Sequence, residues 1–310
     1  MSIRHLDFFF EPRSVAVIGA SERPRSVGAT VWHNLGAGGY AGALYAVNPK
    51  HGKVGTARCW PDVASLPAAP ELAVVCTPPA AVPGLIDQLG RAGTKAAIVL
   101  SAGLDEAQEQ AMLTAARSHL LRIVGPGALG VLAPHAGLNA SFAHTGAAAG
   151  TLAFVSQSGS VASAMLDWAR GRGIGFSQLV SLGEAIDVDF GDMLDWLASD
   201  PHTRAVLLHV ESMAHARKFP LRRVRPRQAA GLQLQAPGIL PLLRRPAHVA
   251  DRCAPGRPRH PARAGAAMGA VAADPAARAA GRAAGTGHAG AAGGAARGHA
   301  TSAAAGGAQG

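Results

Sequence analysis

The 310-residue sequence predicts an α/β protein with two consecutive parallel-sheet domains and a C-terminal tail that lacks a core. Three observations support this prediction. Short apolar runs rich in Val, Ile and Leu recur along residues 14–211, as in strands that are covered on both faces. Amphipathic segments separate these runs, which is the pattern of βαβ units. The composition then changes abruptly after Phe219.

The first predicted domain, residues 1–135, alternates strands and helices. Its expected strands are Ser14–Gly19, Leu44–Asn48, Leu72–Cys76, Ala96–Leu100 and Arg122–Gly125. Its expected helices are Val27–Leu35, Ala80–Arg91 and Asp105–His119. Strands and helices that alternate at this spacing predict a parallel sheet.

The second predicted domain, residues 150–219, repeats the same alternation. Its expected strands are Leu152–Ser156, Phe176–Ser181 and Ala205–Glu211, and its expected helices are Ser160–Arg170 and Gly191–Leu197. The segment Ala133–Gly150 is rich in Ala and Gly and shows no periodicity. We therefore expect this segment to connect the two domains.

Residues 220–310 differ in kind from the rest of the chain. They hold 13 Arg, no Lys and 2 Asp, whereas residues 1–219 hold 16 Lys and Arg against 17 Asp and Glu. From Arg263 onward, 34 of 48 residues are Ala or Gly, so burial cannot offset the entropy of ordering them. We expect a disordered tail rich in Ala, Gly, Arg and Pro. GC-rich codons encode these residues in any reading frame. The tail could therefore result from a frameshift, or it could be a genuine basic tail.

The net charge of +10 therefore does not indicate a nucleic-acid partner. The basic excess lies in the tail, and every aromatic residue that could stack on a base lies at or before Phe219. Three cysteines without a CxxC pair argue against a disulfide framework and a structural zinc site. The apolar patch of Leu6 and residues 8–10 is too short for a signal peptide. We expect a cytoplasmic protein without a membrane partner.

The first strand of the sequence ends in a turn that suits a phosphate group. Gly19, Ala20 and Ser21 follow the strand, and Gly28 opens the next helix. Backbone N–H groups and the helix dipole at such a turn favour an anion. The spacing is not GxGxxG, which disfavours a simple NAD dehydrogenase. Lys50, after the second strand, favours a ligand that carries phosphate, although it could equally be a surface lysine in a loop.

Small residues and prolines also follow the later strands of this domain. They are Thr77, Pro78 and Pro79 after the third strand, Ser101 and Gly103 after the fourth, and Pro126 and Gly127 after the fifth. Open parallel sheets bind ligands at the carboxyl ends of their strands. Ordinary turn chemistry explains each of these ends separately. Together with the Gly19 turn they predict a cofactor crevice.

The second domain offers a second anion site. Ser156, Gln157, Ser158 and Gly159 lie between an apolar strand and a helix, where hydroxyl groups and the helix N-terminus favour an anion. A nucleophilic serine is disfavoured because the GxSxG elbow is absent. Glu211 ends the last apolar strand, where it could orient a histidine or accept a proton, or could simply be solvated.

Four carboxylates lie between Glu184 and Asp192. Carboxylates this close together could hold a metal ion. The alternative is a loop in which Asp189 or Asp192 caps the helix that follows. The spacing favours the capping interpretation.

Several ordered motifs resemble the NDP-forming acyl-CoA synthetases. The segments SVAVIGAS (14–21), VNPK (47–50), CTPP (76–79) and VGP (124–126) resemble their CoA-binding domain. The segments VSQSG (155–159), SLGEAIDVDFGD (181–192) and DPHTRAVLLHVE (200–211) resemble the succinyl-CoA-ligase-type domain that follows it. The resemblance covers about residues 6–219. The opening region also resembles bacterial protein lysine acetyltransferases, which carry the same synthetase-like region.

The resemblance implies a Rossmann-like CoA-binding domain followed by a flavodoxin-like domain. It implies that CoA or an acyl-CoA contacts Gly19, Ser21, Lys50, Thr77, Pro78, Pro79, Ser101 and Gly103. It places the phosphate of a phosphohistidine at Ser158 and Gly159, and it matches Glu211 to the glutamate that pairs with that histidine. ATP, ADP and Mg²⁺ would belong to an ATP-grasp β subunit or domain.

Three features depart from that family's pattern. Gly127 stands where the family usually has Asn near the thiol end of CoA. The phosphorylated histidine should lie beyond Phe219, where His248 has the wrong neighbours and His288 comes too late. We expect neither an ATP-grasp domain nor an acetyltransferase domain in residues 220–310. The sequence therefore predicts an incomplete α-like synthetase portion that is inactive alone. The alternatives are the acyl-CoA-sensing half of a lysine acetyltransferase and a non-catalytic CoA-binding module.

Overall fold

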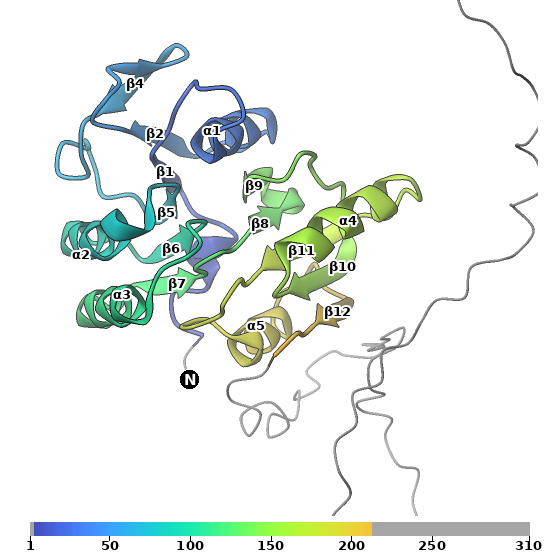
Figure 1. The fold of residues 1–310 in the computed structure, drawn as a ribbon. Helices are drawn as coiled ribbons and strands as arrows, with labels where there is room; N and C mark the ends of the chain where they lie inside the picture. Colours follow the sequence, from blue (N-terminus) through green and yellow to red (C-terminus); the bar gives the residue numbers. More distant parts are fainter. Residues whose placement is uncertain (1–2, 213–310) are drawn as a thin grey trace, which may run out of the picture. The chain divides into compact units, whose positions relative to one another are not determined.

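Residues 3–212 are described by a computed structural model, and all of them fall in one unit of the chain. The predicted tail, residues 220–310, lies outside the described residues, as do His248 and His288. Within the described part, two sheets follow one another along the chain (Figure 1). None of the helices of residues 3–212 has the length and hydropathy that a membrane crossing requires.

The first sheet has seven strands in the order β3-β4-β2-β1-β5-β6-β7. The strands are β1 (Ser14–Ile18), β2 (Ala43–Val47), β3 (Lys53–Val54), β4 (Ala57–Trp60), β5 (Leu72–Val75), β6 (Ala96–Val99) and β7 (Arg122–Val124). All neighbouring pairs are parallel except β3 with β4, which form an antiparallel hairpin. The five predicted strands and their parallel pairing are confirmed, and the hairpin is an addition.

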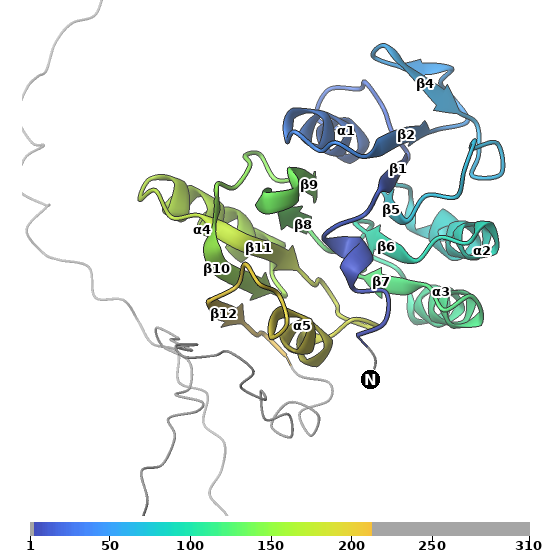
Figure 2. The ribbon, with the colours of Figure 1, turned by 180° about the vertical axis from the view of Figure 1, so that it is seen from behind.

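Alternate residues of these strands enter two different cores. Val15 and Val17 pack on the side of α1 (Val27–Ala37), whereas Ala16 and Ile18 pack on the side of α2 (Val82–Ala92) and α3 (Glu106–Ser118). Both faces of the sheet are therefore covered, as Figure 2 also shows. This explains why the strands read as continuous apolar runs.

The second sheet has five strands in the order β12-β10-β11-β8-β9. They are β8 (Gly130–Ala133), β9 (Leu138–Ser141), β10 (Ala149–Ser156), β11 (Phe176–Ser181) and β12 (Ala205–His209). β10 is parallel to β11 and β12, whereas β8 and β9 pair antiparallel. The helices α4 (Gly159–Arg170) and α5 (Phe190–Leu197) cover opposite faces of this sheet.

The connector predicted between residues 133 and 150 is wrong. That segment contains β9 and the first residues of β10, and the second sheet already begins at Gly130. β8 and β9 are buried along their whole length, so they show no alternation of polar and apolar residues. A Cβ at Gly130 would overlap the carbonyl oxygen of Ala140, so small residues mark close packing here. The last strand was also predicted too long, because β12 ends at His209.

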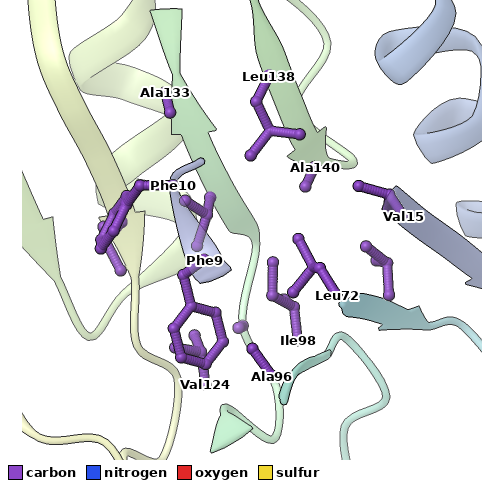
Figure 3. Close-up of a cluster of buried hydrophobic side chains, with 14 of the residues drawn as sticks. Phe9, Phe10, Val15, Leu72, Ala96, Ile98, Val124, Ala133, Leu138 and Ala140 are labelled. Carbon is purple, nitrogen blue, oxygen red and sulfur yellow. The ribbon is translucent and has the colours of Figure 1, made fainter. Parts of the chain in front are cut away.

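The N-terminal segment belongs to a core that the two sheets share. Leu6, Phe9 and Phe10 are fully buried, and Figure 3 shows the two phenylalanines among residues of both sheets. Phe10 stacks on Trp196 of α5 with ring centroids 3.9 Å apart, and Trp196 Nε1 donates a 2.8 Å hydrogen bond to Asp7. The apolar patch that is too short for a signal peptide thus packs the two domains together.

Candidate functional site

The first candidate site lies where the first sheet changes direction. From β1 the chain passes through α1 to β2 on one side, and it later returns to β5 on the other side of β1. The carboxyl ends of β1 and β5 therefore border a topological switch point, which is where open α/β sheets bind ligands. Gly19 and Thr77 meet there, because a Cβ at Gly19 would lie 3.4 Å from Cγ2 of Thr77.

Glycines make the turn between β1 and α1 possible. Gly19 has φ +92°, a conformation that L side chains rarely adopt. A Cβ at Gly28 would overlap the carbonyl oxygen of Gly19, so the first turn of α1 packs directly against the strand end. Ser26 caps α1 by accepting a 3.3 Å hydrogen bond from the Ala29 N–H. The N-terminus of α1 therefore lies at this edge of the sheet, where its free backbone N–H groups favour an anion.

Asn48 ties the Lys50 loop to this turn. Its Nδ2 donates a 2.8 Å hydrogen bond to the carbonyl oxygen of Ala20, and its Oδ1 accepts one of 3.0 Å from the Lys50 N–H. Lys50 is exposed, so its side chain is accessible to a ligand at the same edge. Ser21 lies in the tethered turn and accepts a hydrogen bond from the Arg23 N–H. The sequence did not predict that Asn48 positions this loop, although Asn48 is part of the VNPK segment at residues 47–50.

The ends of β5 and β6 are joined by a hydrogen bond. Ser101 Oγ donates to the carbonyl oxygen of Thr77 at 2.5 Å, and the carbonyl oxygen of Ser101 accepts from the Gly127 N–H at 2.9 Å. Pro78 and Pro79 follow directly and start the short helix η2 (Pro79–Ala81). The structure thus brings all the predicted strand-end residues to one edge of the sheet.

This edge fits a polar ligand such as CoA. Thr77 Oγ1 is buried and has no hydrogen-bond partner in the described part of the protein. An unpaired buried hydroxyl costs about 1–3 kcal/mol, so a ligand group that pairs with it would gain that energy. A Cβ at Gly103, which has φ +77°, would meet no atom within 4 Å, so the edge is open there. Cys76 is not a nucleophile, because burial raises the pKa of its thiol to about 12.

The second candidate site repeats the same topology. From β10 the chain passes through α4 to β11 and then through α5 to β12 on the other side of β10. Ser158 caps α4 by accepting a 3.4 Å hydrogen bond from the Val161 N–H, and Gly159 is the first helical residue. The predicted phosphate-binding residues therefore lie at a helix N-terminus beside a switch point.

Gln157 holds Glu211 at this second switch point. Its Oε1 accepts hydrogen bonds from the Glu211 N–H at 2.7 Å and the Ser212 N–H at 2.8 Å. Its Nε2 donates to Ser212 Oγ at 3.3 Å. Glu211 is exposed and lies beside the N-terminus of α4, and its catalytic role stays a prediction. Local sequence patterns do not predict these hydrogen bonds, because they join residues more than 50 positions apart.

The carboxylate-rich loop before α5 joins the two domains. Asp189 caps α5 by accepting from the Asp192 N–H at 3.0 Å, which confirms the capping interpretation. Arg122 of β7 pairs with Asp187 at 3.1 Å and with Asp192 at 2.8 Å. Within residues 3–212, no three His, Cys, Asp or Glu side chains are grouped so that they could hold a metal ion. The contacts of this loop are the helix cap and the ion pairs with Arg122.

Residues 126–129 lie between the two candidate sites. The Gly127 N–H is bonded to Ser101 at the first site. A Cβ at Gly159, at the second site, would lie 3.3 Å from Cβ of Leu129. Ser181 Oγ accepts a 3.0 Å hydrogen bond from the Leu129 N–H. Ligands at the two sites would thus approach each other over this short segment.

Comparison with known proteins agrees with this geometry. The family described as "CoA binding domain" matches residues 13–134, and the family described as "Succinyl-CoA ligase like flavodoxin domain" matches residues 149–227. The chain carries a CoA-binding domain followed by a succinyl-CoA-ligase-like flavodoxin domain. The predicted fold and the resemblance to acyl-CoA synthetases are confirmed by these matches.

Individual relatives are ADP-forming ligases. Acetate–CoA ligase [ADP-forming] I of Archaeoglobus fulgidus is 36% identical over 220 residues, which are 69% of this chain and 32% of that protein. The α subunit of the corresponding ligase I of Pyrococcus furiosus is 35% identical over 224 residues, which are 69% of this chain and 48% of that protein. The matched part of the chain therefore spans 32% and 48% of the length of these two relatives.

A solved structure shows the same similarity. The dinucleotide-forming acetyl-coenzyme A synthetase 1 of Ca. Korarchaeum cryptofilum, in complex with phosphate and ADP, is 34% identical to this chain with a TM-score of 0.67. The match covers 69% of this chain and 47% of the synthetase chain. The similarity thus extends over both domains of the described part.

Proposed function

We propose that the chain is the CoA- and phosphate-binding α-like portion of an ADP-forming acyl-CoA synthetase. One observation carries this proposal. Residues 126–129 link the two candidate sites, because the Gly127 N–H is bonded to Ser101 at the first site and Leu129 lies against Gly159 at the second. An acyl thioester at one edge and a phosphate at the other can therefore meet, as phosphorolysis of an acyl-CoA requires.

Each predicted residue has a role in this proposal. CoA or acyl-CoA lies along the edge formed by Gly19, Ser21, Lys50, Thr77, Pro78, Pro79, Ser101 and Gly103. Its phosphates are placed near the turn between β1 and α1, because backbone N–H groups and a helix N-terminus favour anions. The inorganic phosphate is placed at the N-terminus of α4, at Ser158 and Gly159.

The proposed step needs no oxidant or metal. A phosphate oxygen attacks the thioester carbonyl carbon, so a C–O bond forms and the C–S bond breaks. The CoA thiolate leaves and takes a proton from solvent, and an acyl phosphate remains. Glu211 would then stabilise a histidine that accepts the phosphoryl group. ADP and Mg²⁺ would be supplied by an ATP-grasp β subunit or domain.

Calorimetry on the full chain tests the ligand. We expect CoA and acetyl-CoA to bind and NAD to bind more weakly. Tighter binding of NAD would overturn the assignment. The methyl group of Gly28→Ala overlaps the carbonyl oxygen of Gly19, so this variant should bind CoA at least tenfold more weakly. Gly36→Ala on the same helix is the matched control, because its Cβ would meet nothing within 4 Å.

Release of the CoA thiol from acetyl-CoA tests the chemistry. We expect release to depend on phosphate. Gly159→Val should abolish it without changing CoA affinity, because the added side chain meets Leu129 at the phosphate site. Gly171→Ala at the other end of α4 is the control. Binding of CoA without phosphate-dependent release would identify a non-catalytic CoA-binding module instead.

A further inference from the structure

Two cations face each other at the outer end of the first sheet. Lys53 of β3 and Arg58 of β4 are directly opposite partners in the antiparallel hairpin, so their side chains lie on the same face of it. Both residues are exposed, and neither forms an ion pair with a carboxylate in the described part of the chain. Like charges directly opposite one another destabilise a hairpin, so an anion bound between them would relieve the repulsion.

Trp60 holds one of these cations near the carboxyl edge of the sheet. β4 is parallel to β2, so Trp60 at the end of β4 lies level with the end of β2. The guanidinium carbon of Arg58 lies 3.7 Å from the centroid of the Trp60 ring. The carbonyl oxygen of Trp60 accepts a 2.8 Å hydrogen bond from the N–H of Asn48, which also anchors the Lys50 loop. The charge of Arg58 is therefore held beside the loop that carries Lys50.

The hairpin is also bound to the turn between β1 and α1. The Gly55 N–H, at the tip of the hairpin, donates a 2.5 Å hydrogen bond to the carboxylate of Glu22. Glu22 follows Ser21 in the turn where the phosphates of CoA are placed. Its carboxylate forms no ion pair with Lys53 or Arg58. The two cations therefore belong to a hairpin that is fixed next to this turn.

The order of the strands gives the direction of the ligand in the proposed function. The thiol end of CoA runs over the ends of β5 and β6, which carry Thr77 and Ser101, because the site at α4 is linked to that side. The pyrophosphate lies at the turn between β1 and α1. The nucleotide end therefore extends to the other side of β1, over β2 and β4 (Figure 1). The ribose of that nucleotide carries the 3′-phosphate, which thus comes to the hairpin.

We propose that Lys53 and Arg58 bind the 3′-phosphate of CoA and make the chain select CoA over dephospho-CoA, which lacks this group. This inference rests on the proposed function and names the form of the ligand that the same site accepts. The planar guanidinium of Arg58 can bind two phosphate oxygens at once, and Lys53 adds a second positive charge. Together they match the charge of about −2 on a phosphate monoester.

The test compares the affinities of the full chain for CoA and dephospho-CoA by calorimetry at low ionic strength, where exposed charges are screened least. We expect CoA to bind about tenfold more tightly. Lys53→Gln and Arg58→Gln each remove one charge, so each should reduce this ratio about threefold, and the double variant should bring it near one. Arg117→Gln removes an exposed charge from α3, at the other end of the sheet, and should leave the ratio unchanged.

The ratio separates recognition of the 3′-phosphate from a structural role of the hairpin. Lys53→Arg keeps the charge and should keep the ratio. If the glutamine variants weakened the binding of both ligands equally, the hairpin would only support the fold and the inference would be overturned. Because each variant is measured with both ligands, and either single variant reports the effect, a folding defect in one of them does not remove the test.

Two further results separate this inference from the proposed function. Equal affinity of the wild-type chain for CoA and dephospho-CoA would overturn the inference alone. Failure of both ligands to bind the wild-type chain would overturn the proposed function and the inference with it.

Discussion

The two switch points of this protein hold their strand ends by different means. In the CoA-binding domain, backbone packs on backbone, with Gly28 against Gly19 and no room for a side chain. In the flavodoxin domain a side chain holds the strand end, because the amide oxygen of Gln157 accepts hydrogen bonds from the backbone of Glu211 and Ser212. Two sheets with the same switch-point topology thus fix their strand ends by different contacts.

In the proposed function the two sites hold different ligands. A long ligand with a pyrophosphate would gain from a backbone that it can approach closely, and glycine permits that approach. Glu211 beside a phosphate would have to be fixed in place, and a side-chain amide can accept two N–H groups at once. Variants at the two positions should therefore separate the two functions, and variants between the domains should affect both.

Arg122→Met should have the largest effect, because Arg122 joins the two domains. Its guanidinium is nearly buried between Asp187 and Asp192, so its removal leaves two carboxylates without their partner. We expect a loss of about 3–4 kcal/mol in the free energy of unfolding, measured by urea denaturation of the full chain. Arg117→Met on α3 is exposed and should cost less than about 0.5 kcal/mol. An equal loss of unfolding free energy in the two variants would contradict the role of these ion pairs in joining the domains.

Gly28→Ala should affect the CoA-binding domain alone. The methyl group overlaps the carbonyl oxygen of Gly19, so α1 must shift away from β1. We expect a loss of about 2–3 kcal/mol in stability and at least a tenfold loss of CoA affinity. Phosphate affinity should stay unchanged. A variant that bound CoA normally would show that the turn between β1 and α1 does not contact the ligand.

Gln157→Ala should affect the flavodoxin domain alone. It removes the acceptor of two backbone N–H groups at the end of β12. We expect a loss of about 1–2 kcal/mol in stability and of phosphate-dependent thiol release, with CoA affinity unchanged. The matched control is Gln110→Ala, because Gln110 is exposed and its side chain donates a long hydrogen bond of 3.5 Å to Thr114 Oγ1. If Gln157→Ala lost as much CoA affinity as Gly28→Ala, the two switch points would not be independent.

Glu184→Gln should have the smallest effect on stability, and the effect should depend on pH. The folded-state pKa of about 7 lies above the ordinary value of 4.5, so the folded protein holds this proton more tightly than the unfolded chain. Stability therefore falls as the pH rises from about 4.5 through 7, because ionisation is penalised only in the folded state. The variant lacks this penalty and should gain about 1 kcal/mol on the wild type between pH 5 and pH 8, after allowance for solvent screening. Thermal unfolding at the two pH values would measure this gain, and a difference that did not change with pH would contradict the raised pKa of Glu184.

The sequence was sufficient for elements that carry their signal locally. The strands β1, β5 and β6 are continuous apolar runs because both of their faces are covered, and each run is followed by the Gly, Ser, Thr or Pro of a strand end. Because parallel strands place their carboxyl ends on one edge, the order of the elements alone predicted that Gly19, Thr77 and Ser101 gather there. The N-cap role of Asp189 likewise follows from neighbouring residues.

Elements that depend on distant partners could not be predicted in this way. The small residues of β9 are buried because a neighbouring strand packs closely against them. The segment at Phe9 and Phe10 is apolar because it packs between two sheets. Local periodicity holds no information on such contacts.

The sequence by itself thus determined two βαβ domains, their strand ends and the residue types that suit anions at those ends. Only the tertiary structure decided which distant groups complete each site. The amide of Gln157 reaches Glu211, Arg122 reaches Asp187, and the carboxyl group of Glu184 reaches Gly127. The physical reason is that hydrogen bonds and charge interactions depend on distances of a few ångströms in space, which the fold sets and the spacing along the chain does not.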